Sequence, residues 1–127
     1  MKYALVTGGS RAIGRSISLK LSAMGYPVIV NYRSNQEAAE ETKRLIEEAG
    51  GVCELLPFNV SDVEAVDKAM EQWSEKHTED YIAVLVNNAG IREDTLMVFM
   101  QNDQWSKVLD TNLNGFFYIT RRLLKDM

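Results

Sequence analysis

The sequence predicts an α/β fold in which a parallel β-sheet is covered by helices on both faces. Four short apolar runs alternate with stretches of helical periodicity along the chain. The last run, residues 81–86, is apolar without interruption, which is typical of a strand buried on both sides. Because right-handed crossovers between parallel strands place helices on both faces of a sheet, this strict alternation favours a doubly wound sheet.

The first half of the chain contains two strand–helix units. Residues 3–6 predict the first strand, which a glycine-rich turn connects to an amphipathic helix that ends near Gly25. Residues 28–30 predict the second strand. We expect Ser34 to cap the second helix, because Glu37 stands three residues later, as in a capping box.

The second half repeats this pattern. Residues 52–58 predict the third strand, and Ser61 with Glu64 predicts a second capping box at the start of the third helix. Residues 81–86 predict the fourth strand, and residues 102–127 are mostly helical in pattern. No linker or low-complexity segment interrupts the sequence, so we expect one domain.

The composition excludes several classes of protein. The chain has 127 residues, of which 46% are hydrophobic and 25% charged, as in one globular domain. Cys53 is the only cysteine and His77 the only histidine, so one chain cannot assemble a disulfide or a Cys/His metal site. The apolar runs are too short to cross a bilayer and the start lacks a signal-peptide pattern, so we expect a cytoplasmic protein. The net charge of −4 argues against nucleic-acid binding.

Charge is distributed unevenly along the chain. No carboxylate side chain precedes Glu37. An anionic ligand near this end would explain the bias, and chance would explain it equally well, because buried strands and packed helices contain few acids. The basic residues of this stretch are Lys2, Arg11, Arg15, Lys20 and Arg33.

The turn after the first predicted strand has the features of a phosphate-binding site. Amide N–H groups at a helix N-terminus attract a pyrophosphate, and glycines let the backbone approach it closely. The spacing differs from the general G-x-G-x-x-G fingerprint. A purely structural turn is the alternative. The residues expected to contact a dinucleotide are Thr7, Gly8, Gly9, Ser10, Arg11, Ile13 and Gly14.

The end of the second predicted strand indicates which dinucleotide is bound. NAD-binding folds usually place a carboxylate there for the ribose 2′-hydroxyl, and this chain has none. Arg33 and Arg11 could instead pair with a 2′-phosphate through forked hydrogen bonds, which predicts NADP(H). Solvated arginines are the alternative. The contacts expected at this strand end are Asn31, Tyr32, Arg33 and Ser34.

Two motifs carry a resemblance to a known family. Residues 7–14 fit the pattern T-G-x-x-x-[AG]-x-G, with Ala12 where glycine is more usual, and Asn-Asn-Ala-Gly at 87–90 follows the fourth predicted strand. Over its whole length the chain resembles the short-chain dehydrogenase/reductase family. Residues 90–97 and Trp105 are most similar to the 3-oxoacyl-[acyl carrier protein] reductase branch of that family.

The resemblance implies roles for further residues. Asn59 and Val60 are similar to the pair that contacts adenine, although Asn59 could equally be a turn former. The Asn-Asn-Ala-Gly element implies both bracing of the sheet and contact with the cofactor. Those contacts would come from Asn88, Ala89 and Gly90.

The resemblance also implies a reaction. Hydride from NADPH would reduce a carbonyl, such as a 3-oxoacyl thioester of fatty acid biosynthesis, with help from a serine and a Tyr-x-x-x-Lys helix. Asn112 matches the asparagine that holds a water in the proton relay and is the one catalytic residue expected here; a polar mid-helix residue is the alternative. No tyrosine has a lysine four residues later. Tyr118 precedes Arg122 at that spacing, and we expect this pair to serve packing and surface.

We therefore expect residues 1–127 to form the dinucleotide-binding half of a Rossmann-type, doubly wound parallel sheet, truncated after the fourth strand and its helix and inactive alone. The full-length enzyme would be a homo-oligomer using NADP(H) and a small-molecule or acyl-carrier-bound carbonyl substrate, without nucleic-acid or membrane partners. A non-catalytic nucleotide-binding or assembly module is the alternative. A flavodoxin-like regulator fits less well, because its acid cluster or phosphate loop is missing.

Overall fold

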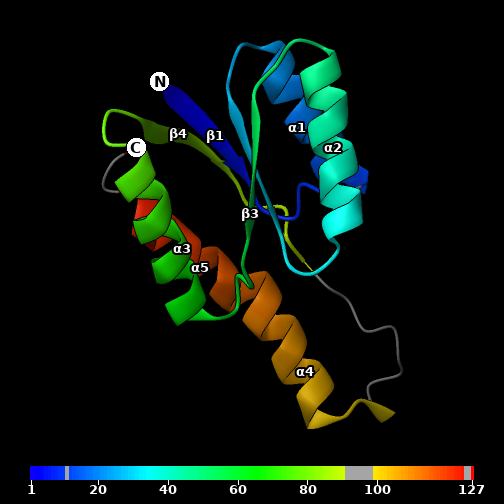
Figure 1. Ribbon diagram of the computed structural model, residues 1–127. Helices are drawn as coiled ribbons and strands as arrows, with labels where there is room; N and C mark the ends of the chain where they lie inside the picture. Colours follow the sequence, from blue (N-terminus) through cyan, green and yellow to red (C-terminus); the bar gives the residue numbers. More distant parts are fainter. Residues whose placement is uncertain (11, 91–98, 125–126) are drawn as a thin grey trace.

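The computed structural model describes residues 1–10, 12–90, 99–124 and 127. Four parallel strands form one sheet in the order β3-β2-β1-β4 (Figure 1). The strands are β1 (Lys2–Val6), β2 (Val28–Tyr32), β3 (Cys53–Pro57) and β4 (Tyr81–Val86). The helices are α1 (Ala12–Ala23), α2 (Gln36–Glu48), α3 (Val63–Lys76), α4 (Asn102–Leu109), the short π-helix η2 (Asp110–Asn114) and α5 (Gly115–Leu124). The predicted α/β fold with a parallel sheet is confirmed.

The central strand β1 contributes side chains to two apolar layers, one on each face of the sheet. Leu5 pairs in register with Ile29 of β2 and Leu85 of β4. Because successive side chains of a strand point to opposite faces, Leu5 and Val6 enter different layers. Figure 1 shows α3 and α5 on one face of the sheet and α1 and α2 on the other. This two-sided cover explains the uninterrupted apolar runs in the sequence.

In each layer, apolar helix residues at helical spacing in the sequence pack against the sheet. On one face, buried residues of α3 and α5 pack against the sheet; they include Val66, Met70, Trp73, Ile119 and Leu123. On the other face, Ile46 of α2 packs with Val28 and Val30. In the ranges that the structure describes, no helix is both long and apolar enough to span a bilayer.

Two helices begin one residue later than the capping boxes predict. Asn35 caps α2, where its side chain accepts a hydrogen bond from the backbone N–H of Ala38. Asp62 caps α3 in the same way. The predictions for Ser34 and Ser61 were therefore wrong, because the next residue in each case is a strong capping residue that reaches the first-turn amides.

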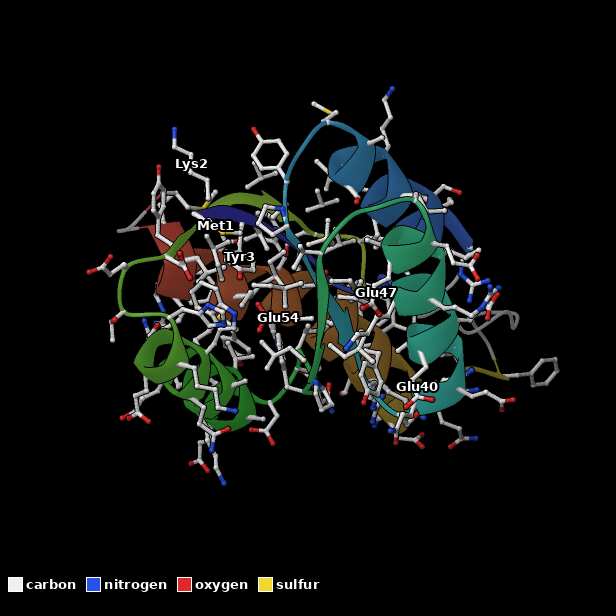
Figure 2. The ribbon with its side chains drawn as sticks, turned by 45° about the horizontal axis from the view of Figure 1, so that its top comes forward. Met1, Lys2, Tyr3, Glu40, Glu47 and Glu54 are labelled. Atoms are coloured by element: carbon white, nitrogen blue, oxygen red, sulfur yellow. The ribbon has the colours of Figure 1, made fainter. Side chains whose placement is uncertain are left out.

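A polar cluster lies at the amino ends of the strands. The two ring nitrogens of His77 lie 2.9 Å from Asp80 Oδ2 and 3.0 Å from Glu54 Oε1, so both can donate only when the ring is protonated. Burial lowers the pKa of His77, but the hydrogen bonds and charges of Asp80 and Glu54 outweigh it and raise that pKa. Tyr3 and Glu54 are labelled in Figure 2; burial and then the Glu54 charge raise the pKa of Tyr3 to about 12.

Candidate functional site: a groove at the carboxyl ends of the strands

A groove of about 340 Å³ lies where the loops after the four strands meet. Parallel strands bring their carboxyl ends to one edge of a sheet, which is where ligands bind in open α/β folds. The predicted contacts that line it are Gly8, Ser10, Asn31, Arg33, Ser34, Asn59, Val60, Asn88, Ala89 and Gly90. The structure therefore gathers four separate sequence segments into one cavity.

Other predicted contacts lie beside the groove. Thr7, Gly9 and Gly14 are buried next to it, and Tyr32 is half-buried. Ile13 is 70% exposed and faces the outer side of α1 instead, so its side chain does not line the groove. Arg11 lies outside the described residues.

The glycine-rich turn after β1 is braced by Asn31. The Gly8 N–H donates to Asn31 Oδ1 at 3.3 Å, and the Gly9 N–H donates to the Asn31 carbonyl at 3.0 Å. The Asn31 amide in turn donates to the carbonyls of Leu56 and Phe58. Asn31 is 2% exposed, so it supports the turn from below. The N–H groups of Gly8 and Gly9, which we expected to contact a pyrophosphate, thus donate to Asn31 instead.

Helix α1 approaches this turn as closely as a glycine allows. A Cβ atom on Gly14 would overlap the Gly8 carbonyl oxygen and lie 2.6 Å from Asn88 Nδ2. Gly8 itself adopts a φ of +64°, a conformation that glycine takes without strain. Ala12, the first residue of α1, lines the groove beside this contact.

Thr7 and Asn88 clamp the loop after β4 onto the turn after β1. Thr7 Oγ1 donates to the Val86 carbonyl and accepts from the N–H groups of Asn88 and Ala89, both at 3.0 Å. Asn88 Nδ2 donates to the Gly8 carbonyl, also at 3.0 Å. The bracing role predicted for the Asn-Asn-Ala-Gly element is therefore visible, while its contact with a cofactor remains a prediction.

The charge that the described residues bring to the groove is positive. Among the described residues that line it, Arg33 is the only one with a formal charge. Arg33 is exposed just before the N-terminus of α2, and the described part of the chain gives its guanidinium no hydrogen-bond or ion-pair partner. A ligand phosphate at this end of the groove would meet no carboxylate among those lining residues.

Asn59 acts as a turn former in this structure. Its Oδ1 accepts from the Ser61 N–H at 3.0 Å and from Ser61 Oγ at 2.8 Å. Both hydrogen bonds stay within residues 59–61, as expected of a turn former. The Nδ2 group of Asn59 keeps its two N–H donors, and Val60 lines the groove beside it. The turn-forming role of Asn59 is visible in these hydrogen bonds, while its contact with adenine stays a prediction.

Asn112 lies in η2, the π-helical turn between α4 and α5. It lines a second cavity of about 60 Å³ beside Thr7 and Ala89. A Cβ on Gly90 would lie 3.1 Å from Asn112 Oδ1, so the loop after β4 passes close to this side chain. Single π-helical turns often occur at functional sites. The relay role of Asn112 stays a prediction.

Tyr118 and Arg122 behave as packing and surface residues. Tyr118 packs against the core under α3, and Arg122 Nε lies 3.7 Å from Asp67 Oδ1 on that helix.

Cys53 is a buried strand residue, and burial raises the pKa of its thiol to about 12. The thiol therefore stays protonated at neutral pH.

Sequence reasoning missed three residues that the fold brings to the groove: Asn35, Phe58 and Thr111. Asn35 follows the predicted Ser34, and its strong capping preference was the available signal. Phe58 was assigned to a strand and Thr111 to a helix, and both assignments leave the facing side chain undetermined. Ala12 has a φ of +53°, the only positive φ of a described non-glycine residue, at the position where glycine is more usual.

Comparison with known proteins agrees with this geometry. A family model described as short chain dehydrogenase matches residues 2–127. A 3-oxoacyl-[acyl-carrier-protein] reductase of Synechocystis sp. is 40% identical over 126 residues, which are 99% of this chain and 50% of that protein. The acetoacetyl-CoA reductase of Paracoccus denitrificans is 42% identical over 126 residues, 99% of this chain and 49% of that protein.

A solved structure gives the same result. A crystal structure from Agrobacterium tumefaciens, described as a gluconate dehydrogenase, matches with a TM-score of 0.92 and 30% identity, and the match covers 99% of this chain and 49% of that one. The chain spans about half the length of the curated relatives it matches. Because the family model matches residues 2–127, this chain belongs to the short-chain dehydrogenase family.

Proposed function

We propose that this chain is the dinucleotide-binding half of an NADPH-dependent carbonyl reductase, whose substrate is a 3-oxoacyl thioester. The observation that carries the proposal is the groove itself, which joins the braced turn after β1 to the cationic, carboxylate-free end of β2. Two similar proteins are named for the reduction of 3-oxoacyl and acetoacetyl thioesters, which supports the substrate class.

The residues present fit a dinucleotide phosphate. The close packing of Gly14 on Gly8 brings the start of α1 to the groove, where the helix dipole favours an anion. Arg33 and the Ser34 hydroxyl lie at the other end, at the N-terminus of α2. They would hold the 2′-phosphate of NADP(H), which a carboxylate at this place would repel.

The bound dinucleotide would supply the hydride, and this chain's residues would bind and orient it. Asn112 would hold a water next to the groove. The serine, tyrosine and lysine that donate and move the proton would come from sequence beyond these residues, because no tyrosine here has a lysine four residues later. We therefore propose that residues 1–127 alone bind NADPH without turnover.

A pair of titrations tests the cofactor proposal. NADPH fluorescence should report tighter binding than NADH fluorescence for the 127-residue protein. Replacing Arg33 by Ala should weaken NADPH binding about tenfold, the effect of one charge-assisted hydrogen bond of roughly 1.5 kcal/mol. NADH binding should change little. Equal affinity for both dinucleotides in the unsubstituted protein would reject the preference for NADPH.

A turnover assay separates the enzyme from its alternative. NADPH oxidation with a 3-ketoacyl thioester should be absent for the 127-residue protein and present for the reading frame that contains a downstream Tyr-x-x-x-Lys helix. A reading frame without that helix would favour a non-catalytic nucleotide-binding or assembly module. Robust oxidation by residues 1–127 would show that the division between the two halves is wrong.

A further inference from the structure

Arg15 connects the phosphate-binding turn to helix α2. It lies on α1, half-buried, and its guanidinium uses two nitrogens for three hydrogen bonds. Nη2 donates to the Ser10 carbonyl at 2.9 Å and to the Ala38 carbonyl at 3.0 Å. Nε donates to Thr42 Oγ1 at 2.9 Å. We call Arg15, Ser10, Ala38 and Thr42 the Arg15 network.

Thr42 closes the Arg15 network. It is fully buried on the inner face of α2, and its hydroxyl lies 2.7 Å from the Ser10 carbonyl and 3.4 Å from the Ala38 carbonyl. Because a hydroxyl has one proton, the shorter distance shows that Thr42 donates to Ser10. The Ser10 carbonyl thus accepts from Arg15 and Thr42 together. Its direction is fixed from α1 and from α2.

The hydrogen bonds of Arg15 depend on the planar shape of its guanidinium group. Its described partners are two carbonyls and a hydroxyl, with no carboxylate at ion-pair distance in the described ranges. The hydrogen bond from Arg44 is the main reason that the pKa of the neighbouring Glu41 is lowered, and the charges of Arg44 and Arg15 lower it further. The planar fork of Arg15 spreads its donors over two nitrogens that face different acceptors, whereas the three N–H donors of an ammonium group share one atom.

The Arg15 network joins the two walls of the groove. Ser10 lines the wall formed by the turn, and Arg33 and Ser34 line the wall at the start of α2. Ala38 lies in the first turn of α2, directly behind that wall. The separation between the turn and α2 therefore depends on hydrogen bonds that Arg15 makes to both.

We propose that Arg15 is a positioning residue that sets the preference for a 2′-phosphorylated dinucleotide. The inference rests on the proposed function, because it concerns the same groove. A dinucleotide with a 2′-phosphate contacts both walls, whereas one without that phosphate makes fewer contacts with the α2 wall. Loss of the Arg15 network therefore weakens NADPH binding more than NADH binding.

The experiment compares NADPH and NADH dissociation constants, by fluorescence titration, for Arg15→Ala, Arg15→Lys and a control, Lys20→Ala, which removes a positive charge from the same helix. Arg15→Ala should weaken NADPH binding about tenfold, the effect of one to two net hydrogen bonds, and lower the NADPH preference severalfold. Arg15→Lys should behave like Arg15→Ala. Lys20→Ala should leave both constants unchanged. Urea unfolding of each variant confirms that the titrated protein is folded.

Thr42 provides an independent arm should Arg15→Ala fail to fold. Thr42→Val removes the hydroxyl at nearly constant shape and should lower the NADPH preference, whereas Thr42→Ser should retain it. Wild-type affinity in Arg15→Lys would overturn the proposal, because charge alone would then suffice. An unchanged NADPH-to-NADH ratio in both Arg15→Ala and Thr42→Val would also overturn it. Failure of the unsubstituted protein to bind either dinucleotide would instead reject the proposed function.

Discussion

Replacing Ala12 by Gly should stabilise the protein, although glycine usually destabilises a helix. Ala12 opens α1 with a φ of +53°, close to the left-handed value of about +57°. In that conformation the Cβ of an L-residue crowds its own carbonyl oxygen, at a cost of about 1–2 kcal/mol. Glycine has no Cβ and adopts the same φ freely.

The magnitude follows from two opposing effects. Relief of the left-handed strain contributes about 1–2 kcal/mol to the free energy of unfolding. The greater freedom of glycine in the unfolded chain removes about 0.4–1 kcal/mol. Because Ala12 is exposed, little packing is lost with its methyl group. The net gain should be about 1 kcal/mol, which for a chain of this size raises the Tm by roughly 4 °C.

The assay is urea unfolding at equilibrium, with thermal unfolding as a second measurement. Ala23→Gly is the matched control, because Ala23 is the exposed last residue of the same helix and has no positive φ. That control should lose up to about 0.5 kcal/mol, because glycine adds freedom to the unfolded chain and Ala23 has no strain to relieve. The two substitutions should therefore have opposite signs. A loss of stability in Ala12→Gly equal to that of Ala23→Gly would refute the reasoning.

Three further predictions concern other contacts. The pKa of His77 is raised above its usual 6.5 in the folded protein, so its contribution to stability is complete below pH 6.5 and is lost as pH rises through the folded value. Urea unfolding across this range should show that decline, and His77→Gln should flatten it. Gly14→Ala should cost about 1–3 kcal/mol in urea unfolding and weaken NADPH binding, because its Cβ would overlap Gly8. Thr7→Val should cost a similar 1–3 kcal/mol, because the N–H groups of Asn88 and its neighbour lose their acceptor, while Thr7→Ser should remain near wild type.

The location of the groove could be predicted because it depends on local patterns and on topology. Alternating apolar runs identify parallel strands, and the carboxyl ends of such strands meet at one edge. The residues just after each run, such as Gly8, Arg33 and Asn88, therefore had to lie near one another. The structure places them around one cavity. Their type and position were sufficient, without knowledge of any side-chain rotamer.

Which of those residues brace the protein and which are left to contact a ligand could not be predicted from the sequence. Asn31 and Asn59 are both polar residues at strand ends, yet the hydrogen bonds of Asn31 brace the turn and those of Asn59 form a local turn with Ser61. An amide side chain can serve a ligand or the backbone equally well. Which one it serves depends on the atoms within about 3 Å, which for Asn31 come from distant segments and for Asn59 from a residue two positions later.

The sequence by itself determined the sheet, the helices on both faces and the segments that meet at the groove, because these follow from hydrophobic periodicity and chain connectivity. Only the tertiary structure decided which side chains hold those segments together. Thr7 contacts residues about 80 positions away, and Arg15 reaches α2 across 23 to 27 positions. Such contacts leave no periodic trace in the sequence, because each is made by a single side chain between segments far apart in the chain.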